Sequence, residues 1–320
     1  MQNEKVSVIV PLYNSRLTIT ETILSLVGQT YQNLEIILVD DGSTDNTANI
    51  VKEFTAEYSN IKYFWKENGG VGAARNYGID RATGGYIALC DHDDLWMPDK
   101  LEKQMKLFTN DRIGLVYNGC RTVKVVDGVE ESIAVTMTYY SGNCFDQLLR
   151  FNCIPTCSAV IPRRVINRTG GFHESIDMHG VDDKHLWLRI AHDYDVVALK
   201  EILSIRRVTG RNWSMNEAKM LRSAINCLDD IKSMYCNASN SHLFDMAYYE
   251  AYSHYAGNLF LIDDFLEARQ AYLRAIAFNR KQKLNYLRVI ATYLPVTVIR
   301  VVRGLRIRLI GQSTKYISGA

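Results

Sequence analysis

The sequence carries little net charge of either sign. Its 37 lysines and arginines are nearly balanced by 35 aspartates and glutamates, which leaves a formal charge of +2. Proteins that bind nucleic acid through its phosphates usually show a clear basic excess, so we expect no nucleic-acid partner. Hydrophobic residues make up 47% of the chain and charged residues 22%, a composition typical of a globular protein with a large core.

Cysteine is scarce and irregularly spaced. The chain has seven cysteines, an odd number without a repeating interval, which argues against a disulfide framework and favours a reducing compartment. Cys153 and Cys157 form the closest pair, but no second pair of ligand residues accompanies them. We therefore interpret them as buried thiols and not as zinc ligands.

Long hydrophobic runs are missing. The apolar run near the N-terminus is short and ends at Pro11, unlike a signal peptide, so we expect a cytoplasmic protein. Near the C-terminus the uncharged stretch from Val289 to Ile299 is too short to span a bilayer. Arginines flank this stretch or interrupt the residues after it, at positions 288, 300, 303, 306 and 308. This pattern suits either a helix lying on the inner, anionic face of the cell membrane or an amphipathic helix packed on the protein itself.

The sequence does contain an alternation of strand-like and helix-like segments up to about residue 120. Strand-like apolar runs occupy residues 6–10, 34–41, 61–67 and 86–91, and helix-like stretches occupy residues 17–27, 43–58 and 70–82. Apolar strands that alternate with helices predict an α/β fold with a mainly parallel sheet between helices. In such sheets, ligands bind beyond the carboxyl ends of the strands.

Acidic residues gather at two of these carboxyl ends. Asp40 and Asp41 close the second strand, and Asp91, Asp93 and Asp94 follow the fourth. Carboxylates this close repel one another unless a cation joins them, and their oxygens suit Mg²⁺ or Mn²⁺. Such sites often leave the remaining metal positions to substrate phosphates and water. Because a metal-bound diphosphate is a good leaving group, we expect a nucleoside-diphosphate substrate.

The remainder of the chain predicts a second half of the catalytic domain and a helical appendage. Residues at the spacing of one tetratricopeptide-like helix pair are Ala256, Leu259, Ala268, Tyr272 and Ala275. One such pair cannot bury its faces alone, so we expect it to accompany the catalytic domain. The expected parts are a catalytic domain (1–212, with a nucleotide-binding half 1–120 and an acceptor half 121–212), a helical appendage (213–282) and a basic amphipathic segment (283–320).

Several segments, taken in order, resemble the family 2 glycosyltransferases of the GT-A fold. They are "VSVIVPLYN", "SLVGQTYQNLEIILVDDGSTD", "NGGVGAARNYGI", "GGYIALCDHDDLWMPDKLE", "TGGFHES" and "VDDKHLWLRIA", and they cover about residues 5–210. The resemblance implies an inverting transfer of a sugar from a nucleotide-sugar, most often a UDP-sugar, to a hydroxyl group of a saccharide. With a membrane-surface segment, we expect a polyprenyl-linked acceptor of the kind used in bacterial surface-polysaccharide assembly.

The resemblance also implies roles on the donor side. Pro11 and Tyr13 are expected to frame the nucleobase pocket. Asp41 is expected to accept a hydrogen bond from the base, while Asp40 supports the same loop. Arg75 is expected to face the nucleotide-sugar.

The segment "DHDD" resembles the Asp-x-Asp signature of the family. The resemblance implies that Asp93 binds the metal through its carboxylate, and that Asp91 contacts the ribose or sugar and shares the metal. Asp94 is expected to orient the loop. His92 occupies the variable position and is not expected to be a ligand.

Two departures from the family pattern concern the catalytic base and the diphosphate. A carboxylate must take the proton of the acceptor hydroxyl, and the usual Glu-Asp pair is here Asp182-Asp183, with Asp183 at the position of the base. The shorter Asp182 leaves open which of the two acts. Thr209 stands where many relatives carry a histidine near the diphosphate, and Arg207 or Arg211 is expected to supply the missing positive charge.

Three alternative functions can be compared with the sequence. A dinucleotide-binding dehydrogenase is disfavoured, because Arg75 stands where the third glycine of its fingerprint should be. A sugar-nucleotide pyrophosphorylase needs a glycine-rich, basic loop after the first strand, and "PLYNSRLTITE" has no glycine. An inactive membrane-surface scaffold is the remaining alternative, and the acids retained at the expected sites argue against it.

Overall fold

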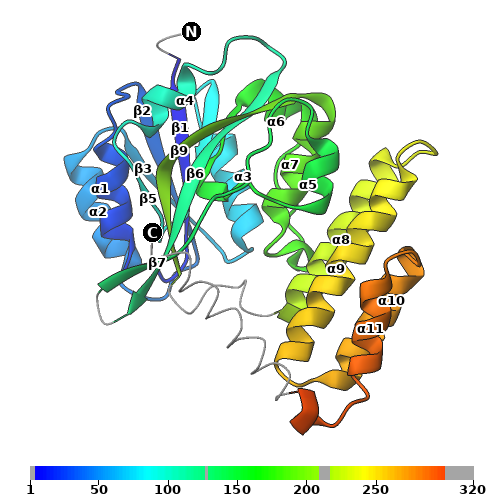
Figure 1. Cartoon of the computed structure of the whole chain (residues 1–320). Helices are drawn as coiled ribbons and strands as arrows, with labels where there is room; N and C mark the ends of the chain where they lie inside the picture. The colour runs from blue at the N-terminus through cyan, green and yellow to red at the C-terminus, as the bar shows by residue number, and fades with distance from the viewer. Residues whose placement is uncertain (1–3, 127–128, 209–216, 300–320) are drawn as a thin grey trace, which may run out of the picture. The chain divides into compact units, whose positions relative to one another are not determined.

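The computed structural model describes residues 4–126, 129–208 and 217–299 of the chain (Figure 1). They divide into two compact units, Met1–Cys236 and Asn237–Ala320. The sequence-based limits at residues 212 and 282 stay a prediction. In the structure, α8 (Glu217–Tyr235) packs against α7 (Asp182–Asp193) and against the short helix η2 (Ile176–Met178), and it therefore lies with the first unit.

Within the described residues, the first unit holds a nine-stranded sheet in the order β3-β2-β1-β4-β8-β6-β9-β5, with β7 paired to β6. The strands are β1 (Val6–Leu12), β2 (Leu34–Asp41), β3 (Ile61–Lys66), β4 (Tyr86–Leu89), β5 (Leu95–Trp96), β6 (Ile113–Val126), β7 (Val129–Val135), β8 (Val160–Pro162) and β9 (Asp195–Val208). β3, β2, β1 and β4 run parallel, as do β6 and β9, whereas β8 is antiparallel to β4 and β6. The α/β fold with a mostly parallel sheet is therefore confirmed.

Helices cover both faces of the N-terminal half of the sheet (Figure 1), namely α1 (Ile19–Val27), α2 (Thr47–Glu57) and α3 (Val71–Arg81). α1 and α2 share a buried cluster with the even-numbered residues of β1, such as Val8 and Val10. α3 packs on the opposite face, where a Cβ at Gly78 would lie 2.7 Å from a methyl group of Ile9. Successive side chains of a strand point to opposite faces, so β1, which is buried along its whole length, contributes to both cores.

The second predicted helix begins later than its sequence pattern indicates. We expected residues 43–58, and α2 spans Thr47–Glu57. The missing turn is a loop that bonds to the end of β1: the Asn14 N–H donates to Ser43 Oγ at 2.9 Å, and the Thr44 N–H donates to Asn14 Oδ1 at 2.9 Å. These bonds join the carboxyl ends of β1 and β2, where the site lies.

The remaining helices of the first unit follow β5 or flank the second half of the sheet. They are α4 (Lys100–Met105), α5 (Phe145–Arg150), η1 (Thr156–Ser158) and α6 (Arg163–Thr169). α7 begins at Asp182 and buries Leu186, Trp187 and Ile190. This buried side anchors the helix, so its first turn holds Asp182 and Asp183 in place.

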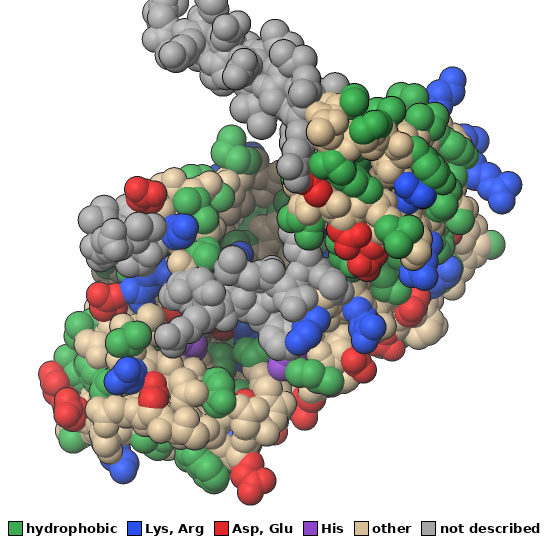
Figure 2. Space-filling model, turned by 90° about the horizontal axis from the view of Figure 1, so that it is seen from below, with side chains coloured by type: hydrophobic (Ala, Val, Ile, Leu, Met, Phe, Trp, Pro, Cys, Tyr) green, Lys and Arg blue, Asp and Glu red, His purple; other side chains and the backbone are tan. Residues whose placement is uncertain are grey.

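The second unit is helical in its described residues and comprises α9 (Ser241–Leu261), α10 (Phe265–Phe278) and α11 (Lys283–Ala291). α9 and α10 pack as a pair through the small and aromatic residues expected from the sequence, all buried: Ala256, Leu259, Ala268, Tyr272 and Ala275. Across the residues that the structure describes, no helix is both long and apolar enough to cross a membrane. In the view of Figure 2, hydrophobic side chains lie beside both basic and acidic ones on this part of the surface.

Candidate active site

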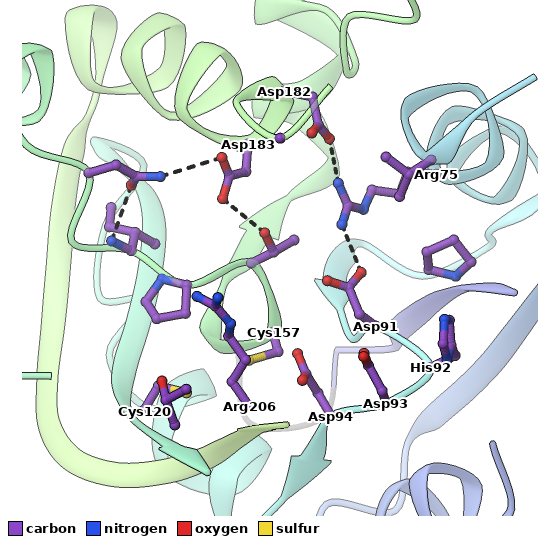
Figure 3. Close-up of a pocket in the computed structure, with 18 of the residues that line it drawn as sticks. Arg75, Asp91, His92, Asp93, Asp94, Cys120, Cys157, Asp182, Asp183 and Arg206 are labelled. Atoms are coloured by element: carbon purple, nitrogen blue, oxygen red, sulfur yellow. Dashed lines mark hydrogen bonds and ion pairs between the residues drawn. The ribbon is translucent and has the colours of Figure 1, made fainter. Parts of the chain in front are cut away.

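A cleft of about 1300 Å³ opens at the carboxyl ends of β1, β2 and β4 and reaches the first turn of α7. Ligand sites for small molecules commonly have 300–1,000 Å³, so this cleft has room for a donor and part of an acceptor. The sequence-predicted residues that line it are Pro11, Tyr13, Asp41, Arg75, Asp91, Asp93, Asp182 and Asp183. Acids from three distant parts of the chain thus share one cavity. Figure 3 shows two of these groups, the acids after β4 and those at the start of α7.

The two acids at the end of β2 have different surroundings. Asp40 is fully buried and accepts hydrogen bonds from the Ser43 N–H at 2.8 Å and the Tyr63 hydroxyl at 2.7 Å. It therefore holds the loop after β2 and does not line the cleft. Asp41 is the acid that reaches the cleft, since neighbouring strand residues point to opposite faces.

The Asp41 carboxylate is fixed by donors from the segment after β3. It pairs with Lys66 Nζ at 2.6 Å and accepts from the Gly69 and Gly70 N–H groups at 2.9 and 2.8 Å. A carboxylate offers about four acceptor positions, so one remains for a ligand. Beside it, the half-exposed ring of Tyr13 offers a flat surface for a nucleobase.

The acidic side chains after β4 are close together and largely buried, which disfavours their charged forms. Burial raises the pKa of Asp93. Burial, with the charge of Asp93 added, raises the pKa of Asp94 well above its ordinary value. His92 turns its Nδ1 toward Thr18 Oγ1 at 3.0 Å. A divalent cation beside Asp93 would stabilise the charged carboxylates.

The residues present fit a metal whose ligands come mainly from outside the protein. Within the described ranges, no three acidic, histidine or cysteine side chains converge on one metal position. Asp93 and Asp91 can supply one or two carboxylates, which is the usual number for Mg²⁺ bound together with substrate phosphates.

Arg75 lies between the two groups of acids (Figure 3). Its guanidinium is buried and pairs with Asp91 Oδ1 at 2.7 Å and with Asp182 Oδ2. The same group lies 5.0 Å from the centroid of the Phe172 ring. Arg75 therefore lines the cleft as expected, but its positive charge is shared by two carboxylates of the protein.

Asp183 lies beside this ion pair with a different set of contacts. It accepts hydrogen bonds from Thr156 Oγ1 at 3.0 Å and Asn152 Nδ2 at 3.4 Å. Burial and the neighbouring charge of Asp182 raise the pKa of Asp183 to about 6. Because Arg75 neutralises Asp182, Asp183 is the acid of the pair that is able to take up a proton near neutral pH.

The two arginines near the end of β9 point in opposite directions. Arg207 is buried behind the acidic loop, where Nε donates to the Asp93 carbonyl, the N–H donates to Asp94 Oδ1 at 3.2 Å, and the guanidinium pairs with Glu21. This placement does not support a contact between Arg207 and a diphosphate in the cleft. Arg206, on the other face of the strand, lines the cleft and points into it (Figure 3). Arg211 lies outside the described residues.

Sequence reasoning missed Arg206, Lys66, Asn152 and Thr156. Lys66 lies in the strand predicted at residues 61–67, so its position beside Asp41 could have been found from the parallel pairing of β2 and β3. Asn152 and Thr156 lie in a segment with no periodic pattern, and no sequence signal points to them. Cys153 and Cys157, from the same segment, are buried free thiols.

Comparison with known sequences gives a consistent result. The sequence model of Glycosyl transferase family 2 matches residues 7–168. An uncharacterised glycosyltransferase of Rickettsia felis is 33% identical over 71% of this chain, which corresponds to 37% of that protein. The UDP-Glc:alpha-D-GlcNAc-diphosphoundecaprenol beta-1,3-glucosyltransferase WfgD of Escherichia coli is 33% identical over 72% of this chain and 87% of that protein.

The chain spans 40% or less of the length of its Rickettsia felis and Rickettsia conorii relatives. Among solved structures, TarS of S. aureus matches with a TM-score of 0.64 and 18% identity, covering 90% of this chain and 53% of that chain. The mannosyltransferase PcManGT of Pyrobaculum calidifontis, in complex with GDP-Man and Mn²⁺, matches with a TM-score of 0.62 and 20% identity, covering 98% of this chain and 87% of that chain. At these identities the likeness shows a shared GT-A-like fold.

Proposed function

The chain belongs to glycosyl transferase family 2, and on this premise we propose that it moves a sugar from a nucleotide-sugar, foremost a UDP-sugar, to a hydroxyl group of a saccharide. The observation that carries the proposal is the convergence of Asp41, Asp93 and Asp183 on one cleft. These acids come from β2, the loop after β4 and the start of α7. A nucleotide-sugar with its metal, and an acceptor opposite them, would occupy the cleft.

On the donor side, Asp41 and the Tyr13 ring would contact the nucleobase, with Pro11 completing the pocket. Asp93, with Asp91, would hold Mn²⁺ or Mg²⁺. When bound, such an ion neutralises the charge that develops on a leaving diphosphate. Arg206 is placed to add a positive charge on the same side, a role that the sequence had suggested for Arg207 or Arg211.

On the acceptor side, we assign the general base to Asp183. Its carboxylate would accept the proton of the acceptor hydroxyl as the glycosidic bond forms. Thr156 and Asn152 hold the carboxylate in place, and Arg75 pairs with Asp182. Attack from the side opposite the leaving diphosphate inverts the anomeric carbon.

The acceptor that we propose is a polyprenyl-linked saccharide of bacterial surface-polysaccharide assembly. The name of the Escherichia coli relative describes an acceptor joined to diphosphoundecaprenol and a UDP-sugar donor. The structures of other relatives include TarS with UDP-GlcNAc and PcManGT with GDP-Man. A lipid-linked acceptor would place the protein on the inner face of the cell membrane.

Donor binding can be tested by thermal unfolding with UDP-, GDP- and dTDP-sugars, with and without Mn²⁺. A ligand at about 100 times its Kd stabilises the folded state by roughly 2.7 kcal/mol, which for a domain of this size corresponds to about 5 °C in Tm. We expect this shift for a UDP-sugar only when Mn²⁺ is present. The variant Asp93→Asn is expected to lose the metal-dependent part, whereas Asp146→Asn, on α5 outside the cleft lining, serves as the matched control.

Slow release of UDP from the stabilising donor completes this test. Binding without release would favour the inactive scaffold. Formation of a nucleotide-sugar from a sugar phosphate and a nucleoside triphosphate would favour the pyrophosphorylase. No thermal shift with any nucleotide-sugar would contradict the proposed function.

Activity is expected to fall on the acid side of a pKa near 6. Burial and Asp182 raise the pKa of Asp183 to about 6, while Arg75 opposes this shift. The Lys184 backbone N–H also donates to Asp183 Oδ1, and the Cys227 thiol is a further titratable group that interacts with this carboxylate. Only the deprotonated form accepts a proton, so kcat/KM should fall about tenfold per pH unit below pH 6, whereas an ordinary aspartate would place this limb near pH 4.

The variant Thr156→Val tests whether the acid limb of the pH profile belongs to Asp183. The lost hydrogen bond stabilises the charged carboxylate, so its removal should raise the pKa of Asp183 and move the acid limb to higher pH. Initial rates between pH 5 and pH 8 would measure the limb, with thermal melts at each pH to exclude unfolding. An acid limb at the same pH in both proteins would contradict the assignment.

A further inference from the structure

Helix α11 buries polar side chains and exposes apolar ones. Asn285 is 0% exposed and Thr292, just past the helix, is 4% exposed. In contrast, Leu287 is 63% exposed and Ile290 is 62% exposed. A surface helix of a globular protein normally shows the reverse arrangement, so the outer side of α11 requires an explanation.

Polar contacts fix this orientation. Asn285 Nδ2 donates to Ser253 Oγ of α9 at 2.6 Å. Arg269 of α10 donates through Nε to Thr292 Oγ1 and through Nη2 to the Thr292 carbonyl, both at 2.9 Å. Turning the apolar residues inward would break these bonds and leave Asn285 and Thr292, with their partly buried partners Ser253 and Arg269, without them.

The outward apolar face consists of residues that are all at least 46% exposed: Leu284, Leu287, Ile290, Tyr293 and Leu294. The first three lie at intervals of three residues, which places them along one side of the helix. Tyr293 and Leu294 continue the exposed apolar residues past its end. Contiguous apolar surface of this kind marks a binding surface more often than chance exposure.

The charged residues of α11 and of the chain after it have one sign. Glu267 is the last acidic residue of the sequence, and lysines and arginines continue after it as far as Lys315. Within the described residues, Lys281 and Lys283 lie at the start of α11 and are exposed, and Arg288 lies within it, partly buried. A partner for this face must therefore combine negative charge with an apolar interior.

We propose that the outward apolar face of α11 binds the surface of an anionic lipid bilayer, lying in the plane of the headgroups. Leucine and isoleucine would enter the acyl boundary, while the lysines and arginines would contact anionic headgroups. A second copy of the chain is a poorer partner, because it would present the same basic charges. The proposal does not depend on sugar transfer, because α11 belongs to the second unit and the residues of the cleft belong to the first.

The test is flotation of the full chain with vesicles of phosphatidylcholine, with and without phosphatidylglycerol. The wild type is expected to bind the vesicles that contain phosphatidylglycerol and not to bind the vesicles of phosphatidylcholine alone. The variant Leu287→Glu/Ile290→Glu is expected to lower binding about tenfold or more. Its matched control is Leu24→Glu/Ile133→Glu, which changes two residues of the first unit that are 50% and 54% exposed and should bind as the wild type does.

Thermal melting shows whether each variant is folded, and light scattering shows whether it is a monomer or a dimer. A folded α11 variant that binds as well as the wild type would overturn the proposal, because another segment would then carry the binding. Absence of binding between the wild type and anionic vesicles would also overturn the proposal. If a wild type that does not bind vesicles is a dimer, and the α11 variant is a monomer, the face binds a second copy of the chain. If that wild type is a monomer, the face is covered by the chain itself.

Discussion

Replacing Asp183 by asparagine is expected to lower kcat by roughly two to four orders of magnitude, with little change in the apparent affinity for the donor. Asparagine has nearly the same shape, and its carbonyl oxygen keeps an acceptor for Thr156. Its amide cannot take up the proton of the acceptor hydroxyl. Initial rates at saturating donor and acceptor, together with donor binding by thermal shift, would measure the two effects separately.

The variant Asp182→Asn decides which acid of the pair is the base. Asp182 pairs with Arg75, so its loss should weaken the ion pair and lower activity less than the loss of Asp183. An added small carboxylate such as formate should restore part of the rate only in the variant that lacks the base. Rescue of Asp182→Asn and not of Asp183→Asn would reverse our assignment.

Replacing Arg75 by methionine is expected to destabilise the protein by about 3–5 kcal/mol. The guanidinium is 5% exposed and pairs with the Asp182 carboxylate, which is 6% exposed. Removing the arginine leaves that charge buried without a partner. Asp91 is 32% exposed, so water can stabilise it, and most of the cost comes from Asp182. Urea unfolding would measure the difference in free energy.

Two further variants test the origin of this cost. The double variant Arg75→Met/Asp182→Leu removes both buried charges and should recover part of the lost stability. The control Lys106→Met breaks an exposed pair with Glu102 and should cost no more than about 1 kcal/mol. If Arg75→Met costs no more than this control, the buried ion pair does not stabilise the fold as we infer.

The parts of the fold that the sequence predicts well are those with a strong local pattern. The run at residues 34–41 is apolar and closed by acids, and β2 spans Leu34–Asp41. The acids at strand ends lie in one cleft because parallel strands end at the same edge of a sheet. The α2 start was misplaced, since Ser43 and Thr44 bond to Asn14, a residue about thirty positions earlier.

The orientation of Arg206 and Arg207 shows another limit of prediction from the sequence. The sequence alone does not distinguish two adjacent arginines in a strand. Their side chains point to opposite faces of the sheet, and only the position of the strand in the sheet decides which one reaches the cleft. That position follows from the pairing of β9 with β6, in which Thr122 opposes Arg206 and Val123 opposes Arg207. The last strand predicted from the sequence is at residues 86–91, so a pairing between β6 and β9 could not be derived. Thr156 and Asn152 had no pattern from which to be predicted.

The ion pair between Arg75 and Asp182 has a consequence for chimeric enzymes. Exchanging the N-terminal half of this chain for that of a relative would create a new donor specificity only if the incoming half carried a cation at the position of Arg75. Without one, the aspartate of the retained half would lose its partner, and the hybrid would fail in folding before its substrate preference could be measured. The two halves therefore do not behave as interchangeable modules.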